Sequence, residues 1–287
     1  MARAGPCLSA CVRPSRLISL AAALTLAGAA ALAEAPRRVV SINLCTDLLA
    51  MLIAEPGQLV SVSKLAADPR SSAMAGAARA YPANRGGAEE IVALRPDLVL
   101  AGRFSDPATI SMLRRLGIKV EQFEITRRID EIPAQIRQAG QLLGREERAE
   151  ALVAEFQARR AALAPPPGVR PLAAIFHPNG YSQGTGTLSD DILAHAGFDN
   201  LAARLGRTGG GLIAIEDLVM ADPDLLILAR PYPATSRAEE ILGHPALRAT
   251  AAARQPAYTD PDWTCGAPQV LDAVARLAER RRALAGE

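Results

Sequence analysis

The chain has 287 residues, of which 49% are hydrophobic and 22% charged, with 32 Lys and Arg against 30 Asp and Glu. Because this balance gives no Lys/Arg-rich face and aromatic residues are only 3%, a nucleic-acid-binding class is excluded. The four cysteines and three histidines show no metal-ligand spacing, so no structural zinc site is expected.

Residues 1–33 have the layout of a secretory signal peptide, with a basic start, an uncharged stretch from Leu17 to Leu32 and a small-residue site at Ala33. The apolar stretch is shorter than the roughly 20 residues that cross a bilayer. Cleavage near Ala33 would remove Cys7, Cys11 and three arginines, taking the formal net charge from +2 to −1. We therefore expect an exported, periplasmic product. The three arginines are Arg3, Arg13 and Arg16.

Residues 34–143 are interpreted as an N-terminal α/β lobe. Apolar runs of strand length alternate with helical patterns, and the order βαβαβ predicts a parallel sheet. A helix is expected over 109–116, closed by Gly117. The expected strands are 38–42, 59–63, 98–101 and 120–123.

Residues 144–168 are predicted to form a connecting helix. The segment from Glu146 to Leu163 is charged on one face and apolar on the other, and the prolines at 165–167 end it. At 1.5 Å per residue such a helix spans about 27 Å, long enough to join two lobes stiffly.

Residues 169–287 are interpreted as a C-terminal α/β lobe. It contains a Gly-rich loop from Asn179 to Gly186, a helix over 189–196 and a final helix after Cys265. The expected strands are 172–176, 225–229 and 257–259.

A repeated unit links the two lobes. Ala88 to Ala101 and Ile215 to Ala229, 127 residues apart, each read as a short helix opened by an acid, a Pro-Asp turn and a buried strand. The fold class is therefore α/β, with two Rossmann-like lobes, parallel sheets and a long rigid helix between them. Two such lobes imply a cleft that binds a ligand.

These features resemble the Fe/B12 family of periplasmic binding proteins, the substrate-binding components of ABC importers for iron chelates, haem and cobalamin. The most specific element is the paired Glu-x-(Leu/Ile)-Val-x-x-x-Pro-Asp-Leu unit, and the resemblance runs from about Arg37 to the C-terminus. It implies a class III fold with small lobe closure, and a non-enzymatic monomer without cofactor or resident metal. The expected partners are a metal chelate and an inner-membrane permease with its ATPase.

The resemblance also implies roles for two acids. Glu89 and Glu216 match the family's acids that pair with arginines of the permease. On helix chemistry alone, each could simply favour the dipole of its helix by some tenths of a kcal/mol. Their recurrence at matched positions favours docking.

Ligand contacts are expected beyond the carboxyl ends of the strands. Tyr181 and Asp262 match positions at which the cobalamin-binding members contact ligand. Arg103 and Arg230 end corresponding strands of the two lobes, and arginine suits anionic oxygen. Trp263, the only tryptophan, either stacks on a ligand or packs under the final helix.

Three positions argue against cobalamin as the ligand, and Arg103 and Arg230 then favour an anionic iron chelate. Leu65, Gly102 and the loop near Gly210 stand where the cobalamin-binding members carry aromatic residues, so large rigid contact surfaces are missing.

Asn43 and Cys45 lie where the first helix opens, and Cys265 opens the last one. All three are candidate ligand contacts. For the cysteines a disulfide, a thiolate on the ligand's metal and two separate buried thiols stay open, because connectivity cannot be deduced from sequence.

The rival interpretation is a secreted α/β-hydrolase. Gly180-Tyr181-Ser182-Gln183-Gly184 fits the Gly-x-Ser-x-Gly pattern, and Asp residues followed by His244 complete the chain order of a catalytic triad. The pattern needs a sharp turn directly between strand and helix, but three residues, starting at His177, separate the strand from it. A binding protein is therefore favoured. His177 is the histidine expected nearest the cleft.

Overall fold

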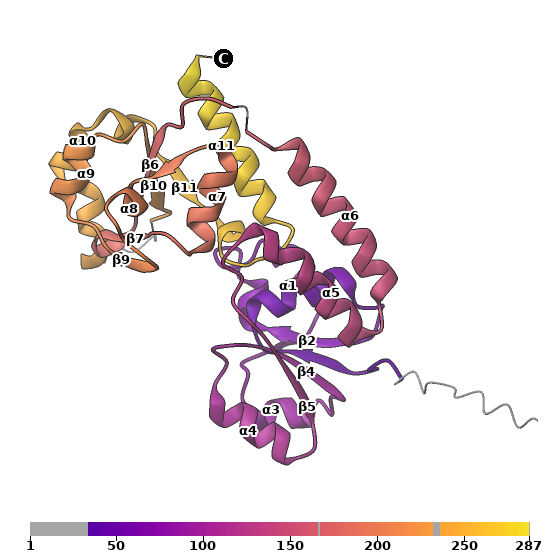
Figure 1. Cartoon of the computed structure of the whole chain (residues 1–287). Coiled ribbons are helices and arrows are strands. Elements are labelled where there is room, and N and C mark those ends of the chain that lie inside the picture. The colour runs from indigo at the N-terminus through magenta and orange to yellow at the C-terminus, as the bar shows by residue number, and fades with distance from the viewer. Residues whose placement is uncertain (1–33, 166, 232–235, 287) are drawn as a thin grey trace, which may run out of the picture. The chain divides into compact units, whose positions relative to one another are not determined.

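Two parallel β-sheets, one after the other in the chain, organise the protein (Figure 1). The computed structural model describes residues 34–165, 167–231 and 236–286, so the predicted signal peptide lies outside the described residues. Residues 35–287 form one compact unit. Within the described residues, no helix has both the length and the apolar character needed to span a membrane.

The first sheet has the strand order β3-β2-β1-β4-β5, and every pair is parallel. The chain moves from β1 outward to β2 and β3 and then returns to β4 on the other side, which makes the sheet doubly wound. Its strands are β1 (Val39–Ser41), β2 (Leu59–Ser63), β3 (Ala83–Asn84), β4 (Leu98–Gly102) and β5 (Lys119–Phe123).

Helices cover both faces of this sheet (Figure 1). Successive strand residues point to opposite faces, so Val39 and Leu98 pack toward α1 and α5, whereas Val40 and Val99 pack toward α3 and α4. The helical segments of this half are α1 (Leu44–Ile53), η1 (Lys64–Ala67), α2 (Ala75–Ala78), α3 (Ala88–Ala93), α4 (Pro107–Arg115), η2 (Ile129–Glu131) and α5 (Ile132–Leu143).

The second sheet has the parallel order β11-β10-β6-β8. Strands β7 and β9 form a separate, two-stranded antiparallel sheet. The strands are β6 (Leu172–Phe176), β7 (Tyr181–Gln183), β8 (Asp199–Asn200), β9 (Gly210–Leu212), β10 (Leu225–Ala229) and β11 (Ala257–Thr259).

The helices of the second half also cover two faces. Ala173 and Ile175 face α7 and α11, while Ala174 and Phe176 face α8, α9 and α10. The helical segments are η3 (Pro178–Gly180), α7 (Leu188–Ala196), α8 (Leu201–Arg204), α9 (Ile215–Ala221), η4 (Arg237–Gly243), α10 (Pro245–Ala249), η5 (Ala251–Arg254), η6 (Pro261–Trp263) and α11 (Val270–Ala285).

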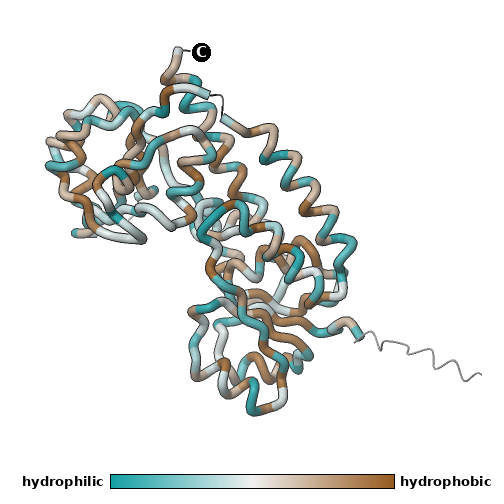
Figure 2. Tube along the Cα trace, in the orientation of Figure 1, coloured by the Kyte–Doolittle hydropathy of each residue, from teal (hydrophilic) through white to brown (hydrophobic). Residues whose placement is uncertain are grey.

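Helix α6 (Glu146–Ala162) connects the two sheets along the chain. Its tube in Figure 2 alternates between hydrophobic and hydrophilic colours, as expected for a helix with one buried stripe. The stripe is formed by Leu152, Val153 and Phe156, and it joins a core that contains residues facing both sheets. The proposed lobe boundaries, 34–143, 144–168 and 169–287, stay a prediction.

The sequence repeat is also a structural repeat. Each unit is a helix followed by a buried strand, α3 to β4 and α9 to β10. Arg95 and Asp222, the equivalent residues before the prolines, both have left-handed backbone, with φ of 50° and 42°. The following acids, Asp97 and Asp224, accept hydrogen bonds from backbone N–H groups at the start of β1 and β6, at 2.7 Å from Arg37 and from Leu172. The Pro-Asp acid therefore anchors the first strand of each sheet.

Candidate functional site

A cleft of about 960 Å³ lies at the carboxyl ends of the strands, where doubly wound sheets bind ligands. One wall is formed by segments that follow β2 and β5, and the other by segments that follow β6, β10 and β11. Eight lining residues carry hydroxyl groups. They are Thr126, Tyr181, Thr185, Thr187, Ser189, Thr208, Thr259 and Thr264.

Tyr181 and Trp263 line this cleft. Tyr181 is 41% exposed, and its ring packs on Gly210, where any Cβ would collide with the phenol oxygen. The missing aromatic side chain at 210 is therefore what leaves room for Tyr181. Trp263 is only 7% exposed, and its indole Nε1 has no hydrogen-bond partner among the described residues.

The guanidinium of Arg230 also lines the cleft, but a carboxylate already holds it. It forms a two-point ion pair with Asp260, with Nη2 to Oδ2 at 3.2 Å, and its Cζ lies 5.4 Å from the centre of the Tyr258 ring. The hydrogen bond to Asp260 raises the pKa of Arg230. Its positive charge is thus largely balanced within the protein.

Asp262 differs from the expectation, because the structure does not put it on the cleft wall. Its buried carboxylate pairs with Arg276 of α11, at 2.7 Å between Oδ2 and Nη1, and burial raises its pKa. Arg276 also reaches Asp260, at 3.4 Å. The acid therefore helps to fix the loop before α11.

A smaller pocket of about 190 Å³ adjoins the cleft and shares three lining residues with it. Arg103, Asn43 and Cys45 line this pocket. Arg103 is paired with Glu124 at 3.2 Å. Asn43 caps α1 by accepting a hydrogen bond from the N–H of Cys45, and a Cβ at Gly102 would lie 2.6 Å from its amide nitrogen. The shared residues are Ile125, Thr126 and Thr264.

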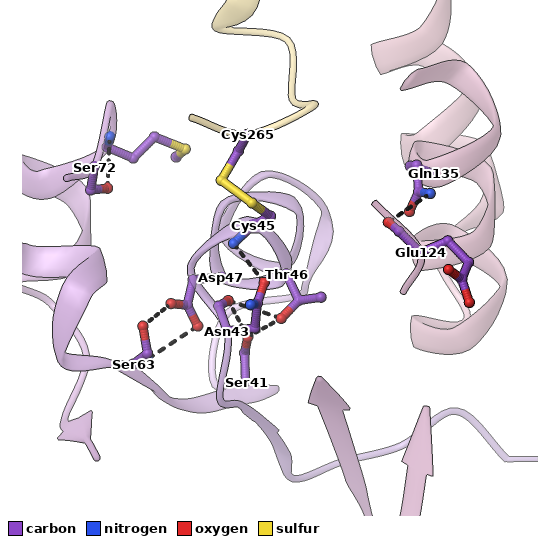
Figure 3. The surroundings of a disulfide bond; sticks show 11 residues. Ser41, Asn43, Cys45, Thr46, Asp47, Ser63, Ser72, Glu124, Gln135 and Cys265 are labelled. Atoms are coloured by element: carbon purple, nitrogen blue, oxygen red, sulfur yellow. Dashed lines mark hydrogen bonds between the residues drawn. A yellow bond between two sulfur atoms is a disulfide. The ribbon is translucent and has the colours of Figure 1, made fainter. Parts of the chain in front are cut away.

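Cys45 and Cys265 form a disulfide, with their Cα atoms 5.2 Å apart (Figure 3). Of the alternatives left open by the sequence, the structure has the disulfide, so neither sulfur is a thiolate for a ligand's metal. The bond joins the start of α1 to the loop before α11. Cys265 is buried and lines neither pocket.

A buried polar network supports the start of α1 (Figure 3). Asp47 accepts hydrogen bonds from the backbone N–H and the hydroxyl of Ser63, at 3.1 and 2.5 Å. The hydroxyls of Ser41 and Thr46 lie 2.7 Å apart beside it. Because burial outweighs these hydrogen bonds, the pKa of Asp47 is raised to about 6.

His177 lines the cleft, as expected. Burial lowers its pKa, so the imidazole is neutral and adds no cation to the wall. Its Nε2 has no hydrogen-bond partner in the described part of the chain. No group of three or more His, Cys, Asp or Glu among the described residues is placed to hold a metal ion.

Ser182 does not have the geometry of a hydrolase nucleophile. It lies within strand β7, paired with Gly211 of β9, and is 1% exposed. The nucleophile motif requires an exposed serine on a sharp turn between a strand and a helix.

Sequence reasoning missed two arginines of the cleft wall. Arg70 donates from Nη2 to the carbonyl oxygens of Arg230 and Pro231, at 3.0 and 3.2 Å, and so bridges the two walls. Arg127 lines the cleft, and its guanidinium has no hydrogen-bond or ion-pair partner among the described residues. Arg127 follows the predicted strand at 120–123, so the strand-end rule could have found it.

Glu89 and Glu216 are exposed in the first turns of α3 and α9. Both helices are anchored by an equivalent buried residue, Ile91 in one and Leu218 in the other. The two acids therefore occupy equivalent places in the structural repeat.

Comparison with known sequences identifies the family. The family model described as periplasmic binding protein matches residues 39–257. The chain belongs to this family. The observed fold, with two parallel sheets and a connecting helix, is that of class III periplasmic binding proteins.

This periplasmic binding protein has curated and structural relatives. It is 28% identical over 197 residues to a cobalamin-binding protein of Halobacterium salinarum, covering 67% of this chain and 53% of that one. The chain thus spans about half the length of the curated relatives it matches. The apo haem-binding protein RhuT of Roseiflexus sp. RS-1 aligns with a TM-score of 0.73 at 24% identity, covering 87% and 99% of the two chains. MolA of Haemophilus influenzae, bound to molybdate, aligns with a TM-score of 0.69 at 18% identity, covering 86% of each chain.

Proposed function

We propose that this protein is the substrate-binding component of an ABC importer and captures a metal chelate in the cleft. The main support for this proposal is the cleft, whose walls are formed by segments that follow strands of both sheets. Its volume of about 960 Å³ is at the upper end of the 300 to 1,000 Å³ typical of ligand sites, which suits a large ligand such as a ferric siderophore, haem or a corrinoid.

The ligand contacts that we propose are Tyr181, Trp263 and Arg230 on one wall and Arg70 on the other. Tyr181 is 41% exposed and lines the cleft, and Trp263 also lines it, with an indole Nε1 that is buried and has no partner in the described residues. Asn43 and Arg103, with the disulfide beside them, would meet only a part of the ligand that enters the smaller pocket.

To deliver the chelate, the protein would dock on the permease through two exposed glutamates, Glu89 and Glu216. Each would form an ion pair with an arginine of the permease. The proposed location is the periplasm, after removal of residues 1–33. The protein would act as a monomer, beside a permease and its ATPase in the inner membrane.

Binding without catalysis is the favoured activity. The Gly-x-Ser-x-Gly sequence belongs to the β7 strand and its preceding turn, and the Ser182 hydroxyl is buried without a partner in the described residues. The hydrolase alternative therefore has no supporting geometry.

The test is a fluorescence titration of the purified protein, whose only tryptophan lines the cleft. Haemin, several ferric siderophores and cobalamin are added in turn, and a nitrophenyl ester assay is run in parallel. We expect saturable quenching of Trp263 by one compound and no ester turnover. Ester turnover that disappears in Ser182→Ala, without quenching by any chelate, would instead establish a hydrolase.

A further inference from the structure

The charges on the cleft wall are unequal. Among the described lining residues, three arginines stand against one acid, Asp260, and His177 is neutral. This leaves an excess of two positive charges in a concave site, where low-dielectric walls focus the potential. The arginines are Arg70, Arg127 and Arg230.

The three arginines differ in what they already bind. Arg230 is paired with Asp260, and Arg70 donates to two carbonyl oxygens across the cleft. Arg127 lies on the same wall as Arg70, and its guanidinium is unpaired among the described residues. It can therefore meet a ligand without first breaking an internal interaction.

The backbone around Arg127 is fixed by the opposite half of the protein. On one side, Thr126 packs so closely on Gly266 that a Cβ at 266 would collide with it. On the other side, the N–H of Ile129 donates to Asp191 of α7 at 2.6 Å. The N–H of Arg127 itself donates to Glu131 at 2.8 Å. A cation held at its backbone but free at its guanidinium is preorganised for a ligand.

We infer that Arg127 recognises an anionic oxygen group of the ligand, so that the bound chelate is an anion. This inference rests on the proposed function and narrows the ligand to chelates that present carboxylate, catecholate or similar anionic oxygens. Arg127 would bind such a group in two-point fashion, and the hydroxyl-rich wall around it would accept or donate further hydrogen bonds.

The experiment compares two ferric complexes of similar coordination geometry, one anionic and one neutral. The trianionic ferric tris-catecholate and the neutral ferric tris-hydroxamate are titrated into the purified protein, together with haemin, which carries carboxylates. Binding is read from Trp263 fluorescence and from the single indole N–H resonance in a ¹⁵N spectrum.

We expect the anionic complexes to bind more tightly, with affinity that falls as salt is added. Arg127→Gln is expected to weaken them by about 10-fold or more, the cost of a lost charged hydrogen bond. Arg115→Gln, which removes the same charge from α4 outside the cleft, serves as the control. It is expected to bind as the unsubstituted protein does.

Tighter binding of the neutral complex, or unchanged binding of anions by Arg127→Gln, would overturn the anion site and leave the binding function standing. If no chelate binds, the proposed function fails, and metal-free citrate decides the site separately. A shift of the indole resonance by citrate that Arg127→Gln abolishes would support the anion site, and its absence would overturn it.

Discussion

Asp47 carries the strongest electrostatic cost in the network under α1. Its side chain is fully buried, and its pKa is raised from 3.8 to about 6 by that burial. Since the folded state holds the proton more tightly than the unfolded state, this group stabilises the fold fully below pH 3.8. The contribution is lost as pH rises through 6.

We therefore predict that Asp47→Asn removes a fall in stability between about pH 4 and pH 6.5. At about 1.4 kcal/mol per pKa unit, the free energy of unfolding of the unsubstituted protein relative to the variant falls by about 2–3 kcal/mol over this range. Urea unfolding at several pH values measures the difference. Asp106→Asn is the control, because hydrogen bonds, chiefly from the Thr109 side chain, lower the pKa of Asp106 and give the opposite sign. A pH-independent difference for Asp47→Asn would contradict the prediction.

Gly266 is required by the close approach of Thr126. We predict that Gly266→Ala lowers the free energy of unfolding by about 1–3 kcal/mol, the usual cost of overpacking. Gly76→Ala is the matched control, since nothing lies within 4 Å of a Cβ there and alanine favours helix α2. Equal unfolding midpoints in urea for the two variants would show that Thr126 moves aside freely.

At the scale of elements, the disulfide ties α1 to the loop before α11 across a sequence separation of 220. We predict that Cys45→Ser with Cys265→Ser lowers the free energy of unfolding by about 2–5 kcal/mol, because the unfolded chain gains freedom. The unsubstituted protein with a reductant is expected to match the double variant, which a reductant leaves unchanged. The same unfolding midpoint with and without reductant would mean that the bond contributes nothing.

The main strands and helices were predictable from sequence because burial on both faces produces apolar runs. The strand at Ala257–Thr259 agrees with its predicted place, and the helix predicted over 189–196 is Leu188–Ala196. The β7 and β9 pair was not predictable, since its Tyr, Ser, Gln and Gly residues show no hydrophobic alternation.

The site was less predictable than the fold for a related reason. Strand ends identify which residues reach the cleft, and Tyr181 and Trp263 do line it. Whether an arginine there is free depends on tertiary register, however. The pairing of Arg230 with Asp260 follows from the alignment of β10 with β11, which no local pattern encodes.

At the scale of the whole molecule, one hydrophobic core contains residues from both sheets and from α6 and α11. The exposed glutamates lie away from this core, in the first turns of α3 and α9. Changes there are expected to leave the cleft intact, because surface substitutions rarely alter the interior.

We predict that Glu89→Arg with Glu216→Arg leaves chelate affinity unchanged and abolishes uptake by cells, since the permease would meet like charges. Uptake of a radiolabelled chelate and a binding titration measure the two effects. Glu147→Arg with Glu155→Arg makes the same charge change on α6 and is expected to allow uptake. Normal uptake by the Glu89 and Glu216 variant would contradict the docking assignment.

The disulfide also gives the polypeptide the connectivity of a closed ring. All strands except β1 lie between Cys45 and Cys265, inside this covalent loop, whereas β1 and helix α11 lie outside it. A protease that cuts once in the loop, for example at Gly168 between α6 and β6, therefore leaves a single covalent molecule, heavier only by the one water added at the cut. Its two fragments part only when the sulfur–sulfur bond is broken as well.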